Sequence, residues 1–222
     1  MTKDDKNTNH HVTSTWEHFN VMTATASHLP HGGDLEYVRL FEAFFPAFSG
    51  KILEIGAGTG FLAQKILEIT DNVDYTILDI ERNMPIIKKT LANFPDVQYV
   101  PSSEYEKVFE NNWDLVIDTH ALSETPDYYY TSIFENISTN ACFVIDYRGD
   151  LEKAGRPSTA WEDPLPAPEH GTSENHFEIA LNLWVSTFDE LQSFRNYDLV
   201  GGKPKGIPVY IGKSTTGNNE NS

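Results

Sequence analysis

Three glycines within five positions, Gly56, Gly58 and Gly60, mark the place in this sequence where a ligand is expected. They follow the apolar run of a buried strand and precede a helical pattern in ILEIGAGTGF. In an open α/β sheet, the turn between such a strand and helix lies at the carboxyl ends of the strands, where ligands bind. Phe61 stands where the dinucleotide fingerprint G-x-G-x-x-G needs its third glycine, and no Gly-Lys-Ser/Thr follows. The pattern therefore predicts a bound cofactor, and disfavours a phosphate as the group that the loop holds.

Short β-rich runs alternate with helical patterns between residues 51 and 147. The predicted strands are KILEIG, DYTILDI, VQYV, WDLVIDT and ACFVIDY. The predicted helices between them are FLAQKILEIT, MPIIKKTLANF, SEYEKVFEN and PDYYYTSIFENI. Such alternation is typical of right-handed βαβ crossovers, which build a mostly parallel sheet with helices on both faces. Two later runs, YDLVGG and GIPVYIGK, complete a predicted seven-stranded sheet of the α/β class with a Rossmann-like fold.

The flanking segments are less regular. DLEYVRLFEAFFPAF repeats apolar residues at spacings of three and four, so we expect a helical N-terminal segment over residues 16–48. Four prolines and three glycines within residues 148–175 predict an irregular, lid-like insertion. HFEIALNLWV fits a strand or a helix, and Ser186 with Glu190 predicts that a helix begins in STFDELQSF. Polar ends predict flexible tails at 1–15 and 213–222, which leaves one domain over residues 16–212.

Composition narrows the classes of function. A formal charge of -17 repels polyanions, and no dense run of Lys or Arg is present, so we expect no nucleic-acid partner. No apolar stretch approaches the roughly 20 residues of a membrane-spanning helix, and the N-terminal region lacks the pattern of a signal peptide. We therefore expect a soluble, cytoplasmic protein. Cys142, the single cysteine, has apolar neighbours that favour a buried side chain over a catalytic thiol.

The segments LEIGAGTG and ILDI resemble the first two strand ends of class I S-adenosylmethionine-dependent methyltransferases. The resemblance covers about residues 51–147 and implies the class I methyltransferase fold, with S-adenosyl-L-methionine as the cofactor. In that family an acid in the position of Glu54 helps to hold the methionine end of the cofactor. An acid in the position of Asp79 accepts hydrogen bonds from the ribose hydroxyls.

The chain between Glu54 and Asp79 is long enough for one strand, one turn and one helix, so both acids are expected to reach one ligand. Ser103 and Glu104 occupy the place of the family's contact with the adenine amino group, although the usual Gly-Asp pair is absent. The resemblance implies the following cofactor-binding residues: Glu54, Gly56, Ala57, Gly58, Gly60, Asp79, Ile80, Ser103, Glu104 and Asp118.

DTHALSETP follows the predicted fourth strand, where the resemblance places the sulfonium and the methyl acceptor. Four side chains are expected to surround them: Asp118, His120, Ser123 and Glu124. The segment lacks the Asn or Asp, two prolines and aromatic residue common in amide and adenine methyltransferases, which disfavours such nitrogen acceptors. A hydroxyl acceptor benefits from a base, and neutral imidazole suits that role, so His120 is the candidate. Glu124 is a second candidate base, an orienting group for His120, or a helix cap.

DTHALSETP and IERNMPIIKKTLANF are also similar, more weakly, to segments of bacterial sugar O-methyltransferases. That similarity implies O-methylation of a small hydroxylated acceptor such as a sugar. Two alternatives stay open. Asp118, His120 and Asp146 could bind Mg²⁺, although no regular ligand spacing supports a metal site. The fold could also serve a noncatalytic cofactor-binding or scaffold protein. The sequence does not determine the oligomeric state.

Overall fold

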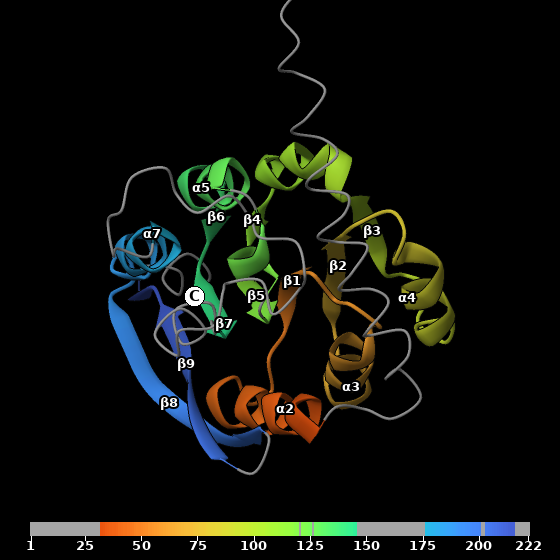
Figure 1. Cartoon of the computed structure of the whole chain (residues 1–222). Coiled ribbons are helices and arrows are strands. Elements are labelled where there is room, and N and C mark those ends of the chain that lie inside the picture. The colour runs from red at the N-terminus through yellow and green to blue at the C-terminus, as the bar shows by residue number, and fades with distance from the viewer. Residues whose placement is uncertain (1–31, 120, 126, 146–175, 201–202, 216–222) are drawn as a thin grey trace, which may run out of the picture.

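The computed structural model describes residues 32–119, 121–125, 127–145, 176–200 and 203–215 (Figure 1). The strands are β1 (Gly50–Ile55), β2 (Val73–Asp79), β3 (Gln98–Pro101), β4 (Asn112–Trp113), β5 (Leu115–Thr119), β6 (Ser138–Thr139), β7 (Ala141–Ile145), β8 (Glu190–Val200) and β9 (Lys203–Lys213). The helices are α2 (Gly32–Phe44), α3 (Phe61–Ile69), α4 (Met84–Thr90), α5 (Asp127–Asn136) and α7 (His176–Val185), with the 3₁₀ segments η1 (Ser102–Glu110) and η2 (Leu122–Glu124).

Seven strands form one sheet in the order β3-β2-β1-β5-β7-β9-β8. The first five of these strands pair in parallel, while β9 runs antiparallel to both β7 and β8. β4 and β6 form a separate two-stranded ladder. The predicted α/β fold, with five parallel strands completed by a C-terminal pair, is confirmed. The order places β1 at the centre, next to β2 and β5, so the loops that follow these three strands meet at one edge.

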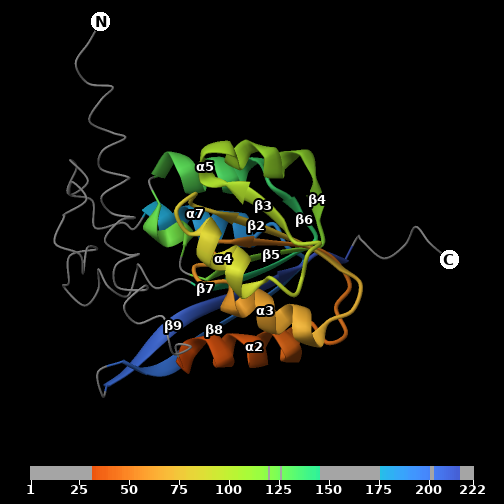
Figure 2. The ribbon, with the colours of Figure 1, turned by 90° about the vertical axis from the view of Figure 1, so that its right-hand side faces the viewer.

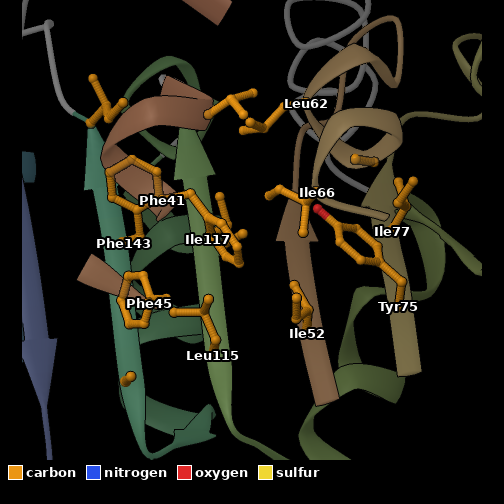
Figure 3. Packing of buried hydrophobic residues seen from close by; sticks show 14 of the residues in the cluster. Phe41, Phe45, Ile52, Leu62, Ile66, Tyr75, Ile77, Leu115, Ile117 and Phe143 are labelled. Carbon is orange, nitrogen blue, oxygen red and sulfur yellow. The ribbon is translucent and has the colours of Figure 1, made fainter. Parts of the chain in front are cut away.

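Helices cover both faces of this sheet (Figure 2). On one face, α2 and α3 pack over alternate residues of β1, β2, β5 and β7 (Figure 3). On the other face, η1, α5 and α7 pack over the intervening residues of the same strands. Neighbouring residues of one strand therefore face different helices, and this alternation decides which of the predicted cofactor-binding residues lie on the same face.

The C-terminal region corrects one prediction and decides another. HFEIALNLWV, which fitted a strand or a helix, forms α7. The helix predicted from Ser186 and Glu190 is wrong, because Glu190 begins β8. The Ser186 hydroxyl donates to the carbonyl of Leu183 at 2.7 Å, and that of Thr187 donates to Trp184 at 2.7 Å, so these residues end α7. The predicted helix SEYEKVFEN forms as the 3₁₀ segment η1, with non-helical backbone angles at Glu104.

Parts of the predicted domain layout lie outside the described residues. These parts are 1–31 of the N-terminal tail and helical segment, the whole 148–175 insertion, and 216–222 of the C-terminal tail. α2 lies within the predicted helical segment 16–48, and β9 ends at Lys213, the first residue of the predicted tail. None of the helices described is both long and apolar enough to span a bilayer.

Candidate active site

The glycine loop after β1 meets different neighbours at each glycine. Gly56, Gly58 and Gly60 all have positive φ angles of 73°, 59° and 79°. A Cβ atom on Gly56 would lie 2.0 Å from the Cβ of Ala121, and one on Gly60 would lie 3.3 Å from Ile87. Around Gly58, no atom would lie within 4 Å of an added Cβ. Gly56 is therefore needed because the chain packs against itself there, and Gly60 lies in tight contact with Ile87. Of the three glycines, only Gly58 faces open space that a ligand can fill.

Glu54 and Asp79 lie on the same face of the sheet. Glu54 pairs with Ile77 in the β1–β2 register, and Asp79 follows two residues later on β2. Because alternate strand residues share a face, both carboxylates lie on the side covered by α2 and α3. Both residues are buried. The structure thus brings together the two acids whose common ligand the sequence predicts.

Asp79 ties the end of β2 to the glycine loop. Its Oδ2 accepts a hydrogen bond from the backbone N–H of Gly58 at 2.9 Å. Its Oδ1 accepts from the N–H of Ile80 at 2.7 Å and from the side chain of Asn83 at 2.9 Å. Burial raises the pKa of Asp79 from 3.8 to about 6, and these three donors oppose the rise. A carboxylate has about four acceptor positions, so Asp79 retains capacity for a ligand hydroxyl.

Glu54 accepts a hydrogen bond from a tyrosine that the sequence did not single out. The hydroxyl of Tyr75 donates to Glu54 Oε2 at 2.9 Å. Burial, and then the charge of Glu54, raise the pKa of Tyr75 well above its usual value, so the tyrosine keeps its proton and acts as the donor. Tyr75 lies on β2 and Glu54 on β1, so their contact depends on the register of the two strands and left no signal in the sequence.

Glu81 joins the loops that follow β2 and β3. One carboxylate oxygen accepts from the N–H of Ser103 at 3.1 Å, and the other accepts from the Ser102 hydroxyl at 3.2 Å. Burial acts to raise the pKa of Glu81, but the hydrogen bonds from the two serines outweigh it and lower the pKa. Glu104 is exposed and pairs with Lys107 along η1. The backbone of Ser103 therefore reaches the loop that carries Asp79 and Glu81, whereas the Glu104 side chain bonds within its own segment.

Asp118 lies on the opposite face from the other two acids. It pairs with Ile55 in the β1–β5 register, and both residues face α5 and α7. Asp118 is buried, and its Oδ1 accepts from the N–H of Leu122 at 3.0 Å. This bond supports the turn after β5, from which Ala121 packs against Gly56. His120 lies outside the described residues, and of Glu124 the structure describes only the backbone, in η2.

Two tyrosines pack the segment η1 against the helix α5. The rings of Tyr105 and Tyr129 lie 4.6 Å apart between centroids. Burial raises the pKa of Tyr129, and neighbouring charges, that of Asp79 foremost, raise it further. The run YYY at 128–130 suggested only faces of a helix, so the sequence did not predict this position.

A family model, the methyltransferase small domain, matches residues 37–151, slightly more than half of the 222-residue chain. The chain belongs to this methyltransferase family. The matched region runs from α2 past β7 and includes the glycine loop, Asp79 and the turn after β5. The class I methyltransferase predicted from LEIGAGTG and ILDI is confirmed, and its cofactor is S-adenosyl-L-methionine.

Solved methyltransferases share the fold. N-methyltransferase NodS from Bradyrhizobium japonicum, in complex with S-adenosyl-L-homocysteine, has a TM-score of 0.56 at 9% identity, covering 81% of this chain and 86% of NodS. An O-methyltransferase from Bacillus cereus, also with S-adenosyl-L-homocysteine, has a TM-score of 0.55 at 12% identity, covering 90% and 91%. The CurJ carbon methyltransferase has a TM-score of 0.50 at 16% identity, covering 81% and 52%. No curated protein sequence matches the chain.

The residues at the glycine loop suit the cofactor of this methyltransferase. The open space at Gly58 gives a ligand access to the backbone, and Asp79 beside it can accept a further hydrogen bond. In the part of the chain that the structure describes, no three His, Cys, Asp or Glu side chains are grouped to hold a metal ion. Of the alternative Mg²⁺ ligands, His120 and Asp146 lie outside that part. Cys142 is buried, which raises the pKa of its thiol to about 12 and keeps it neutral.

Proposed function

We propose that this methyltransferase transfers a methyl group to a hydroxyl of a small molecule, with a sugar or glycan as the favoured acceptor. The observation that carries the proposal is the contact between Gly56 and Ala121, which holds the turn after β5 against the cofactor loop. His120 stands in the sequence between Thr119 at the end of β5 and Ala121. We therefore expect a base in this turn to lie close to the methyl group of the bound cofactor.

The proposed reaction assigns few roles to the protein. Bound S-adenosyl-L-methionine supplies an electrophilic methyl carbon, whose bond to sulfur breaks as the acceptor oxygen bonds to it. His120 takes the hydroxyl proton, because a neutral imidazole is a suitable base near neutral pH. Glu54 and Asp79 hold the two ends of the ligand from one face of the sheet, and this alignment accounts for much of the expected acceleration.

The acceptor class rests on charge and on the turn after β5. A formal charge of -17 opposes a polyanionic acceptor, so we propose a small molecule over a nucleic acid. The segment DTHALSETP lacks the proline-rich pattern of amide and adenine methyltransferases and is similar to that of bacterial sugar O-methyltransferases. Related folds are named as N-, O- and carbon methyltransferases, so the fold by itself supports no choice among them.

Release of S-adenosylhomocysteine tests the proposal on a panel of nucleotide-sugars, glycans and small phenols. We expect turnover with at least one hydroxylated acceptor, and turnover that persists in EDTA. His120→Ala should lower the rate about 10²- to 10⁴-fold while cofactor affinity is retained. His176, exposed on α7, provides the matched control, and His176→Ala should leave the rate unchanged. Cofactor binding without turnover on the whole panel would favour a noncatalytic protein, and loss of activity in EDTA would favour the metal-dependent alternative.

A further inference from the structure

Tyr75 and Glu54 form a polar pair within the apolar cluster beneath α3. Tyr75 is 2% exposed and Glu54 is 1% exposed. Tyr75 lies among Ile52, Ile66 and Ile77, with its hydroxyl oxygen turned toward β1 (Figure 3). Apart from this oxygen, the ring has the surroundings of an ordinary core residue.

The sheet register brings the two groups together. Tyr75 pairs with Ile52, and Glu54 lies two residues further along β1 on the same face. A long side chain can reach such a diagonal neighbour across two strands. The 2.9 Å bond therefore follows from the register of the two strands, and it lies directly before the glycine loop that begins at Gly56.

The carboxylate is the costly member of this buried pair. Burying a carboxylate costs several kcal/mol, and the hydrogen bond from Tyr75 offsets part of that cost. Phenylalanine at position 75 with an apolar residue at position 54 would fill the same space, and such replacements are often neutral or stabilising. A buried acid and its donor next to a ligand loop therefore indicate a role in binding.

We propose that Tyr75 is a positioning residue for the cofactor: its hydroxyl orients the Glu54 carboxylate and stabilises its charged form toward the methionine ammonium group. The inference rests on the proposed assignment of Glu54 to the methionine end. Tyr75 donates to one oxygen of Glu54 and so restrains the orientation of the carboxylate. The ammonium group then meets a charge that is already oriented, and the ligand loses less free energy in ordering its partner.

Two ligands distinguish positioning from a general structural role. S-adenosylhomocysteine carries the ammonium and carboxylate of the amino-acid end, whereas 5′-methylthioadenosine lacks both and keeps the adenosine. We expect Tyr75→Phe to weaken the binding of S-adenosylhomocysteine about tenfold, as the loss of a hydrogen bond to a charged group predicts, and calorimetry measures this. Affinity for 5′-methylthioadenosine should stay within about twofold of the wild type.

A double-mutant cycle tests whether Tyr75 acts through Glu54. Glu54→Gln should weaken the binding of S-adenosylhomocysteine at least as much as Tyr75→Phe does. Adding Tyr75→Phe to Glu54→Gln should lower the affinity by less than about a further twofold. Tyr99→Phe is the matched control, because Tyr99 packs against the same apolar cluster but lies on β3, which β2 separates from the strand of Glu54. Thermal unfolding of every variant checks that the fold is kept.

Three outcomes would overturn the inference. If Tyr75→Phe weakened the binding of both ligands equally, Tyr75 would have a structural role only. Fully additive losses in the cycle would separate Tyr75 from Glu54. Unchanged S-adenosylhomocysteine affinity in Glu54→Gln would remove Glu54 from the methionine end. Failure of the wild type to bind either ligand would instead refute the assignment of the cofactor site itself.

Discussion

Gly56 and Ala121 touch so closely that a Cβ atom on Gly56 would lie 2.0 Å from the Cβ of Ala121. The contact joins the loop after β1 to the turn after β5, which are 65 residues apart in the sequence and adjacent at the sheet edge. Motif glycines are commonly attributed to the ligand alone. At this position, however, the protein's own backbone and side chains exclude a Cβ.

Gly56→Ala is expected to destabilise the fold by more than about 2 kcal/mol, because the added methyl overlaps Ala121 and the positive φ disfavours alanine. Urea unfolding measures the loss. Adding Ala121→Gly should recover part of the stability, since it removes the atom in conflict. No recovery in the double variant would mean that the backbone angle, and not the contact, requires glycine.

Gly58→Ala should behave differently. No protein atom lies within 4 Å of the added Cβ, so we expect only the conformational cost, about 1–2 kcal/mol. Affinity for S-adenosylhomocysteine should fall by more than that cost explains, because the methyl enters the space of the ligand. Calorimetry on the folded variant measures this. Unchanged affinity would place the ligand away from Gly58.

The raised pKa of Asp79 predicts that the stability of the fold depends on pH. The folded protein holds the Asp79 proton more tightly than the unfolded chain, since burial raises the pKa from 3.8 to about 6. The contribution of this group to the free energy of unfolding therefore falls as the pH rises from about 4 to about 6, by up to about 3 kcal/mol. Urea unfolding at several pH values should show this decline in the wild type, and Asp79→Asn should lack it.

Ligand affinity should also depend on the ionisation of Asp79, but it should rise with pH where stability falls. Ribose hydroxyls donate to the ionised carboxylate, so affinity for S-adenosylhomocysteine should rise as the pH passes upward through about 6. Asp79→Asn should weaken binding about ten- to hundredfold at pH 8 and remove the pH dependence. A wild-type affinity that is constant between pH 5 and pH 8 would exclude Asp79 as the acceptor.

Glu81→Ala is expected to release the loop after β3 from the loop after β2. It removes the acceptor of the Ser103 N–H and the Ser102 hydroxyl, so the Ser103 amide should exchange hydrogen faster. Cofactor affinity should fall about threefold to tenfold, while stability changes by less than about 1 kcal/mol. Glu106→Ala, an exposed acid on η1, is the control. If Glu81→Ala and Glu106→Ala have the same effects, the loss of a surface charge explains them, and the two hydrogen bonds do not.

Hydrophobic periodicity along the chain was sufficient to predict the parallel core of the fold. Alternating strand and helix patterns require crossovers, and crossovers of one hand bring the carboxyl ends of parallel strands to one edge. That argument placed Gly58 and Asp79 together, and the 2.9 Å bond between them agrees. It failed after α7, where the residues of STFDELQSF suit a helix start in isolation, because pairing of β8 with β9 over their whole length overrides that local preference.

Sequence alone determined which residue types stand at the strand ends, and thereby the family and its cofactor. Only the tertiary structure decided which of these residues share a face of the sheet, because a shift of one position along a strand moves a side chain to the other face. Glu54 and Asp79 face α3, whereas Asp118 faces α5 and α7. The partners of the acids, Tyr75 for Glu54 and Ser103 for Glu81, come from neighbouring strands and loops. Such contacts depend on register and on loop packing, which arise from residues distant in the chain and leave no local pattern.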